Sequence, residues 1–373
     1  MRHIMVVVLM ALASNAWPTS QETLRQLNLF SEAFRYIRSK SARPVSDEVL
    51  IANAIEGMLA GIDGHSTYVT AEKYQELLGS LRGSFGGIGI EFTMKDGRPV
   101  VVSPLDETPA SEAGIETGDI LIEIEGTPLA GLSLSEIKDK LKGEIGEKIT
   151  LKVERNNQSH TFSMKRRHIN IKALKWSVEK GILMIRLSHF NQGIAGRVAA
   201  LLKKQKDIKA VILDLTNNPG GIFEEALSVA NLFLEKGMIT SVEGRTAKDH
   251  QSFSAKPSKA LLPTLPLYIL VNKGTASSAE IVAAALKENN RATLVGEKTF
   301  GKGSVQTILP VPPGYTAIQL TTGLYKTPKG HLLDQQGVSP HIIIAESAEK
   351  SYQQTPKQAA IDLILKKQSH GKN

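Results

Sequence analysis

The spacing of apolar residues changes twice along the chain, and these changes predict three folding regions. From Glu22 to Leu81 the apolar residues recur at helical spacing, with a break at Pro44–Ser46. From Gly83 to about His168 they alternate with polar residues, which is typical of strands. From Asn170 onward, buried-type apolar runs alternate with amphipathic segments, which predicts an α/β layer around a largely parallel sheet.

The predicted organisation has five segments. In order, they are an export signal (1–16), a helical N-terminal segment (17–82), a compact and partly open β-barrel (83–168), an α/β core of mostly parallel sheet with flanking helices (169–347), and a C-terminal helix and tail (348–373).

The first sixteen residues have the composition of an export signal. Met1–His3 is basic, Ile4–Ala13 is apolar, and Ser14–Ala16 supplies the small residues that a signal peptidase reads. The apolar run is too short to span a bilayer, which takes about 20 residues. We therefore expect a cleaved signal and a periplasmic destination, with an uncleaved anchor as the alternative.

Composition excludes several kinds of chemistry. The chain contains no cysteine, which removes disulfides and thiolate sites, and its nine histidines form no H-E-x-x-H pattern, so we expect neither metal nor cofactor. The formal net charge is +8 and the pI is about 9.4. Because the basic residues are scattered, without an aromatic pattern beside them, we expect no nucleic-acid partner.

A glycine-rich run at the start of the barrel region suggests an anion site. Gly87, Ile88, Gly89 and Ile90 resemble the carboxylate-binding loop of PDZ domains, in which successive backbone N–H groups point into one concave site. A glycine-rich β-turn is the alternative for this tetrapeptide alone. The predicted helix Leu134–Leu141 favours the PDZ-like interpretation.

Two polar loops follow strands of the predicted α/β core. The run KAVILDL is followed by Asn217–Gly221, and the run PLYILVN by Lys273–Ser277. Since the carboxyl ends of parallel strands share one edge of a sheet, we expect these loops to meet there.

Residues in and after these loops could form a hydrolytic site without histidine. Ser277 lies just before an apolar helix and Lys302 lies between Gly301 and Gly303. A serine hydroxyl needs a base, and lysine serves only in its neutral form, which requires shielding from water. Gln306 has the spacing that places it on the same strand face as Lys302, where an amide would orient the amine.

The same site needs donors for an oxyanion. The predicted donors are the backbone N–H of Ser278, at a helix N-terminus, and one from either Gly220 or Gly221.

Simpler interpretations exist for each of these residues. Ser277 with Glu280 fits a capping box, in which the hydroxyl only caps a helix. Ser278, Thr275 and Ser304 are alternative nucleophiles, and a lysine between glycines is usually a solvated turn residue.

Taken together, the ordered motifs resemble the C-terminal processing (tail-specific) serine peptidases. The motifs are IEGMLAGIDGHSTYV, GSFGGIGIEF, AVILDLTNNPGG, NKGTASSAEIVAAAL, VGEKTFGKGSVQT and GVSPHIII. The resemblance implies a crotonase-like core with an inserted PDZ domain, a serine nucleophile, a lysine base and an assisting glutamine, at Ser277, Lys302 and Gln306. It also implies that the PDZ domain binds apolar protein C-termini through residues 87–90 and gates the active site.

The chain departs from the family pattern at four positions. Thr216 replaces the usual arginine before NNPGG, Thr275 and Ala279 replace serines, and Gly64 replaces a proline. None of these changes removes a chemical group from the proposed mechanism. The change at Thr216 leaves open which residue supports the oxyanion loop. We expect a structural role for the neighbouring His65.

A second hypothesis is a non-catalytic scaffold that binds peptides through the PDZ-like groove. Its weakness is the intact set of Ser277, Lys302 and Gln306. The apolar run AAIDLILKK and the N-terminal helices could pack together or pair two subunits, and the need for an adaptor protein is likewise undecided by the sequence.

Overall fold

The computed structural model describes residues 20–71, 74, 85–169, 172–312, 316–344 and 355–370. The chain divides into two compact units, Met1–Met58 and Leu59–Asn373. The predicted export signal lies outside the described residues. Within the described residues, no helix is both long and apolar enough to cross a membrane.

The N-terminal region is helical at first, as predicted. Helix α1 spans Gln21–Lys40 and begins at Ser20, whose hydroxyl accepts the N–H of Thr23. Helix α2 spans Asp47–Ala60. The helical prediction is wrong at Thr67–Val69, which forms strand β1 and pairs with a distant strand of the core.

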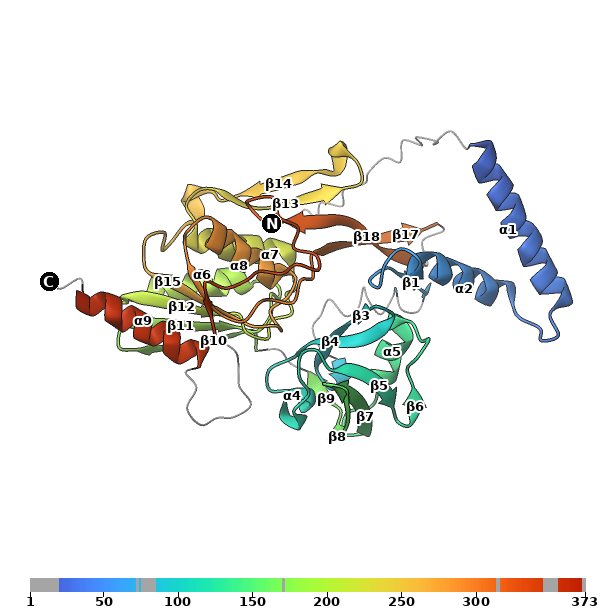
Figure 1. Cartoon of the computed structure of the whole chain (residues 1–373), viewed down its shortest axis with the longest axis horizontal. Coiled ribbons are helices and arrows are strands. Elements are labelled where there is room, and N and C mark those ends of the chain that lie inside the picture. The colour runs from blue at the N-terminus through green and yellow to red at the C-terminus, as the bar shows by residue number, and fades with distance from the viewer. Residues whose placement is uncertain are drawn as a thin grey trace, which may run out of the picture. The chain divides into compact units, whose positions relative to one another are not determined.

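The middle region, predicted as a partly open barrel, consists of a six-stranded antiparallel sheet and a separate two-stranded sheet, together with two helices (Figure 1). Its strands are β2 (Phe85–Gly87), β3 (Ile90–Lys95), β4 (Arg98–Pro104), β5 (Ile120–Ile124), β6 (Thr127–Pro128), β7 (Lys148–Arg155), β8 (Gln158–Lys165) and β9 (Arg167–Ile169), and its helices are α4 (Pro109–Ala113) and α5 (Leu134–Leu141). The hairpin β7–β8 turns at Asn156 and Asn157, which both adopt positive φ. Apolar residues of β3, β5, β7 and α5 form its own core.

The core sheet is mostly parallel. Its order is β10 (Leu174–Glu179), β11 (Ile182–Leu187), β12 (Ala210–Asp214), β15 (Leu267–Val271), β16 (Thr293–Gly296) and β19 (Ile342–Ile343), with only β10 antiparallel to its neighbour.

Helices cover both faces of this sheet (Figure 1). Helices α6 (Ile194–Lys204), α7 (Phe223–Phe233) and α8 (Ser278–Glu288) pack on one face, and α9 (Pro356–His370) packs on the other. Helix α9 contains the apolar C-terminal run, and it buries Ala359, Ala360 and Ile364 against the sheet.

A second, antiparallel sheet carries part of the site. It joins β1, β18 (Thr316–Lys326), β13 (Met238–Gly244) and β14 (Gln251–Ser254), with β17 (Ser304–Val311) paired to β18. Strands β17 and β18 form an antiparallel hairpin. The hairpin β13–β14 was not predicted, because its sequence shows no clean alternation.

Candidate active site

The two polar loops meet at the carboxyl edge of the sheet, which confirms the prediction. Strands β12 and β15 are parallel neighbours. The N–H of Asn217 donates to Asn272 Oδ1 at 2.8 Å, and Asn272 Nδ2 donates to Asn217 Oδ1 at 2.8 Å. The N–H of Ala276 donates to the carbonyl of Asn218 at 2.8 Å.

Ser277 occupies a strained position between its loop and helix α8. Its φ of 53° and ψ of −122° form a combination that glycine adopts readily and serine rarely. The residue is half-buried and precedes a helix whose first nine residues are buried. Such strain persists only where the surrounding structure imposes it, and it concentrates at functional sites.

A single buried carboxylate joins Ser277 to Lys302. Glu280 is fully buried, and its Oε2 accepts the N–H of Ser277 at 2.9 Å and the N–H of Lys302 at 2.8 Å. Two residues far apart in sequence are therefore each one hydrogen bond away from the same atom. This contact brings the backbones of the predicted nucleophile and base together.

The other oxygen of Glu280 fixes the segment before Lys302. Its Oε1 accepts the N–H of Gly301 at 2.8 Å and the hydroxyl of Thr299 at 2.5 Å. Burial raises the pKa of Glu280 to about 7, while these hydrogen bonds act in the opposite direction. The capping-box interpretation identified the contact with Ser277 but missed the contacts with residues 299–302, because they depend on the tertiary fold.

The glycines around Lys302 allow close backbone packing. A Cβ on Gly303 would lie 2.1 Å from the backbone nitrogen of Asp334, and Gly301, with φ of 90°, lies against the backbone of residues 335–337. The segment is therefore held against the neighbouring chain and is not a free turn. Lys302 itself is half-buried, and within the described part of the chain its amine makes no hydrogen bond or ion pair.

The prediction that strand spacing places Gln306 on the same face as Lys302 is wrong. Strand β17 begins only at Ser304, and its register shifts between Val305 and Gln306, so Lys302 and Gln306 do not share one regular strand. Gln306 Nε2 donates to Thr321 Oγ1 at 2.8 Å and to Ser304 Oγ at 3.2 Å. Its Oε1 is buried and has no partner among the described residues, which leaves an acceptor for an amine.

The geometry discriminates between the two predicted oxyanion glycines. The N–H of Gly220 already donates to Asn218 Oδ1 at 2.9 Å, and Gly220 is buried against Ser277. Gly221 is exposed, with φ of 134°, and a Cβ there would lie 2.4 Å from the carbonyl oxygen of Phe190. Gly221 is therefore the better candidate, beside the N–H of Ser278 at the start of α8.

The alternative nucleophiles are engaged elsewhere. The hydroxyl of Ser278 donates to the carbonyl of Gly221 at 2.9 Å, and that of Thr275, fully buried, donates to the carbonyl of Leu215 at 2.8 Å. Ser304 accepts the amide of Gln306. These contacts leave Ser277 as the hydroxyl best suited for attack.

His65 lies nearer to the site than its sequence position suggested. Its Nδ1 is 2.8 Å from Thr93 Oγ1 on β3. Burial lowers the pKa of His65 and the positive charge of Lys302 lowers it further, against the opposing charges of Asp63 and Asp334. This histidine thus lies between the barrel and the surroundings of Lys302.

The predicted carboxylate-binding loop is rigidly held inside the barrel domain. The carbonyl of Ile88 accepts the N–H of Ala110 at 2.9 Å, and that of Gly89 accepts the N–H of Leu105 at 2.9 Å. Gly89 has φ of 77°, and a Cβ on it would overlap Thr108. The side chain of Ile88 is 2% exposed and belongs to the domain core, so Gly87–Ile90 could offer a ligand mainly backbone groups.

Comparison with known proteins identifies the family of the chain. The model of peptidase family S41 matches residues 181–344, and the PDZ domain model matches residues 86–165. The chain is 38% identical to a carboxy-terminal-processing protease of Bartonella bacilliformis, over 93% of this chain and 81% of that protein. It is 30% identical to a probable CtpA-like serine protease of Staphylococcus saprophyticus, over 96% and 74% respectively.

A solved structure shows the same fold. The photosystem II D1 C-terminal processing protease superimposes with a TM-score of 0.74 at 26% identity, covering 86% of this chain and 93% of that one. The chain therefore belongs to peptidase family S41, among its PDZ-containing carboxy-terminal-processing serine proteases. Within the described residues, no group of three or more metal-ligating side chains is present.

Proposed function

We propose that Ser277 is the nucleophile, Lys302 the general base and Gln306 the residue that orients the amine. The neutral amine of Lys302 accepts the proton of Ser277 as the hydroxyl oxygen attacks the scissile carbonyl. The N–H groups of Ser278 and Gly221 donate to the oxyanion that forms. The protonated lysine then returns the proton to the leaving amine, and a water molecule hydrolyses the acyl-enzyme by the same two transfers.

The observation that carries this proposal is the shared carboxylate of Glu280. It hydrogen-bonds the backbones of both Ser277 and Lys302 through one oxygen atom. Since a buried acceptor that satisfies four donors has little freedom, the two reacting residues are held in one arrangement before any substrate arrives.

Cleavage of a peptide with an apolar C-terminus tests the assignment. We expect Ser277→Ala and Lys302→Ala to lose turnover by at least about 10³-fold while their thermal unfolding is unchanged. Lys298→Ala, a change at a nearby exposed lysine, is the matched control and should keep wild-type activity. Retained turnover in Ser277→Ala would refute the proposal.

The proposal extends to substrate recognition. Relatives of this chain are named for processing carboxy termini, and residues 86–165 match a PDZ domain. We infer that Gly87–Ile90 receives the terminal carboxylate of a protein substrate, that an apolar terminal side chain fills the adjoining groove, and that occupancy of the groove gates the active site. A peptide amidated at its C-terminus should bind more weakly than the free acid.

Export completes the proposal. The composition of Met1–Ala16 supports a cleaved signal and a periplasmic enzyme. N-terminal sequencing of protein recovered from the periplasm should give a chain that begins at Trp17, whereas a cytoplasmic chain that retains Met1 would contradict it.

Oligomerisation is a separate question. Helix α1 buries none of its residues, and Leu24, Leu27 and Phe30 are among its exposed apolar side chains. Pairing of two subunits through these apolar side chains of α1 would cover them. An adaptor protein is the other partner that could cover these side chains. Sedimentation of the purified chain alone distinguishes the two, because only self-pairing gives a dimer without an adaptor.

The scaffold hypothesis has less support. The buried unpaired acceptor on Gln306 and the strained backbone of Ser277 both carry a cost in stability that a peptide carrier would have no reason to keep.

A further inference from the structure

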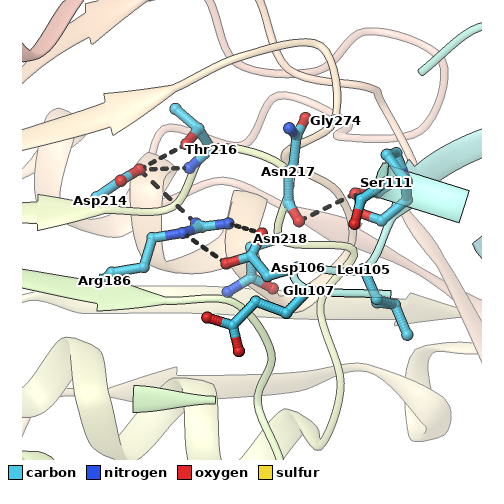
Figure 2. Close-up of polar contacts among 12 residues, drawn as sticks. Leu105, Asp106, Glu107, Ser111, Arg186, Asp214, Thr216, Asn217, Asn218 and Gly274 are labelled. Atoms are coloured by element: carbon cyan, nitrogen blue, oxygen red, sulfur yellow. Dashed lines mark hydrogen bonds and ion pairs between the residues drawn. The ribbon is translucent and has the colours of Figure 1, made fainter. Parts of the chain in front are cut away.

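Arg186, near the end of β11, contacts two acidic residues from different parts of the chain (Figure 2). Its Nε donates to Asp106 Oδ2 at 3.1 Å and its Nη2 donates to Asp106 Oδ1 at 2.8 Å. Its Nη1 lies 3.7 Å from Asp214 Oδ1. Asp106 belongs to the PDZ domain, in the loop between β4 and α4, whereas Asp214 ends strand β12 of the core.

Asp214 in turn fixes the first residue of the oxyanion loop. Its Oδ1 accepts the N–H of Thr216 at 2.9 Å and the hydroxyl of Thr216 at 2.7 Å (Figure 2). Thr216 itself supplies no charge to this loop. In this chain the guanidinium beside Asp214 comes from Arg186, on the neighbouring strand.

A second contact joins the same two parts of the molecule. The hydroxyl of Ser103, on β4 of the PDZ domain, donates to the carbonyl of Asn217 at 3.0 Å. Gly274, in the loop before Ser277, also lies close: a Cβ on it would be 2.7 Å from Thr117 Oγ1 and 2.4 Å from Asn217 Oδ1. The PDZ domain thus lies directly against both loops that form the site.

We propose that Arg186 is a positioning residue that couples the PDZ domain to the oxyanion loop Thr216–Gly221 through Asp106 and Asp214. The proposal rests on the proposed function, since it assigns a regulatory role to a loop that supplies an oxyanion donor. With Asp106 in place, the fork of Arg186 is held beside Asp214. When the PDZ domain shifts on binding a protein tail, Arg186 loses one partner and the loop changes its geometry.

The partly buried position of this pair makes it more than a surface contact. The side chains of Arg186 and Asp106 are 17% and 26% exposed, and the contact is bidentate. A neighbouring pair, Lys175 with Glu107, also joins the core to the PDZ domain, but it is 40% and 59% exposed. Exposed pairs contribute little, so this second pair is a matched control within the same loop.

Hydrogen exchange tests the coupling without relying on catalysis. In the full chain, Asp106→Asn and Arg186→Gln should raise the exchange rates of the backbone N–H groups of residues 216–218, 220 and 221 by about three- to tenfold. Arg186→Lys, which keeps the charge but loses the fork, should give a smaller increase. Glu107→Gln should leave these rates unchanged. Equal rates in Asp106→Asn and Glu107→Gln would overturn the proposal.

Kinetics tests the regulatory part. The wild-type enzyme is compared on one peptide with a free C-terminus and on the same peptide amidated. In the wild type, kcat for the free-acid peptide should exceed kcat for the amidated peptide. We expect Asp106→Asn to reduce this ratio of kcat values about three- to tenfold, toward one. The corresponding ratio of KM values should stay the same, because the PDZ groove sets it. An unchanged kcat ratio sinks the coupling. Absence of turnover in the wild type would instead refute the proposed function, and the exchange experiment would still decide on the coupling.

Discussion

The backbone of Ser277 and the carboxylate of Glu280 are the two features that decide the site at the scale of single residues. Ser277 adopts positive φ without being a glycine, and Glu280 is buried with four donors around it. The positive φ of Ser277 costs backbone energy, because a residue other than glycine rarely adopts it. Burial of Glu280 costs free energy unless the carboxylate is hydrogen-bonded. Both are explained if the surrounding structure holds the hydroxyl and the amine in a reactive arrangement.

Replacing Ser277 by glycine and by alanine separates strain from chemistry. Both variants lack the hydroxyl and should be inactive. Since glycine adopts φ of 53° without strain, Ser277→Gly should exceed Ser277→Ala in free energy of unfolding by about 1 kcal/mol. Urea unfolding measures the difference. An alanine variant as stable as the glycine variant would show that the backbone is relaxed.

Glu280 predicts a defined pH dependence of stability. The folded protein raises its pKa from 4.5 to about 7, so the folded state binds this proton more tightly than the unfolded state. The contribution of Glu280 is therefore fully present below pH 4.5 and is lost as the pH rises to about 7. As the pH rises across this range, the free energy of unfolding of the wild type, measured with urea, should fall relative to that of Glu280→Gln. Parallel curves for the two proteins would contradict the raised pKa.

At the scale of elements, the carboxyl ends of β12 and β15 bring the two polar loops together, and the hairpin β17–β18 carries Gln306. Thr321, on β18, accepts the amide of Gln306 and so holds its buried oxygen in place. The adjacent Thr322 points elsewhere, since its hydroxyl pairs with that of Thr307 on the exposed side.

This difference between neighbouring threonines gives a matched test. Thr321→Val should lower kcat about tenfold at nearly constant KM, because the orienting amide is released. Thr322→Val should leave kcat within about twofold, since that hydroxyl serves no residue of the site. Peptide hydrolysis measures both. Equal kcat values in the two variants would remove Gln306 from the mechanism.

The sequence predicted the elements with strong apolar patterns and missed those without them. Strands β12 and β15 and helix α8 are buried apolar runs bounded by polar loops, so their type and the meeting of their loops could be predicted. Strand β1 is three residues long and follows a helix, so no periodicity reveals it. The role of Glu280 and the selection of Gly221 over Gly220 depend on contacts between distant segments, which no local pattern contains.

At the scale of the whole molecule, the two compact units differ in how much they bury. The unit from Leu59 onward contains the three apolar cores, whereas α1 buries no side chain. Arg186 and Ser103 are among the residues that join the PDZ domain to the core, and the sequence held no sign of either contact.

Removal of α1 should therefore leave the catalytic unit intact. At a concentration where both forms are monomeric, a chain that begins at Ser41 should unfold within about 2 °C of the full chain, because α1 buries no side chain within one subunit. Calorimetry measures this, with sedimentation in parallel to report any loss of subunit pairing. A large fall in Tm for a chain that is monomeric in both forms would show that α1 stabilises the unit in a way its exposure does not reveal.

The burial of Glu280 also bears on when proteolysis begins. The proposed nucleophile Ser277 and the proposed base Lys302 belong to segments that Glu280 joins only where α8 and residues 299–302 enclose its carboxylate. A chain in which α8 has not yet packed against residues 299–302 would therefore lack the proposed catalytic arrangement, so proteolysis would begin only after this part of the chain has folded.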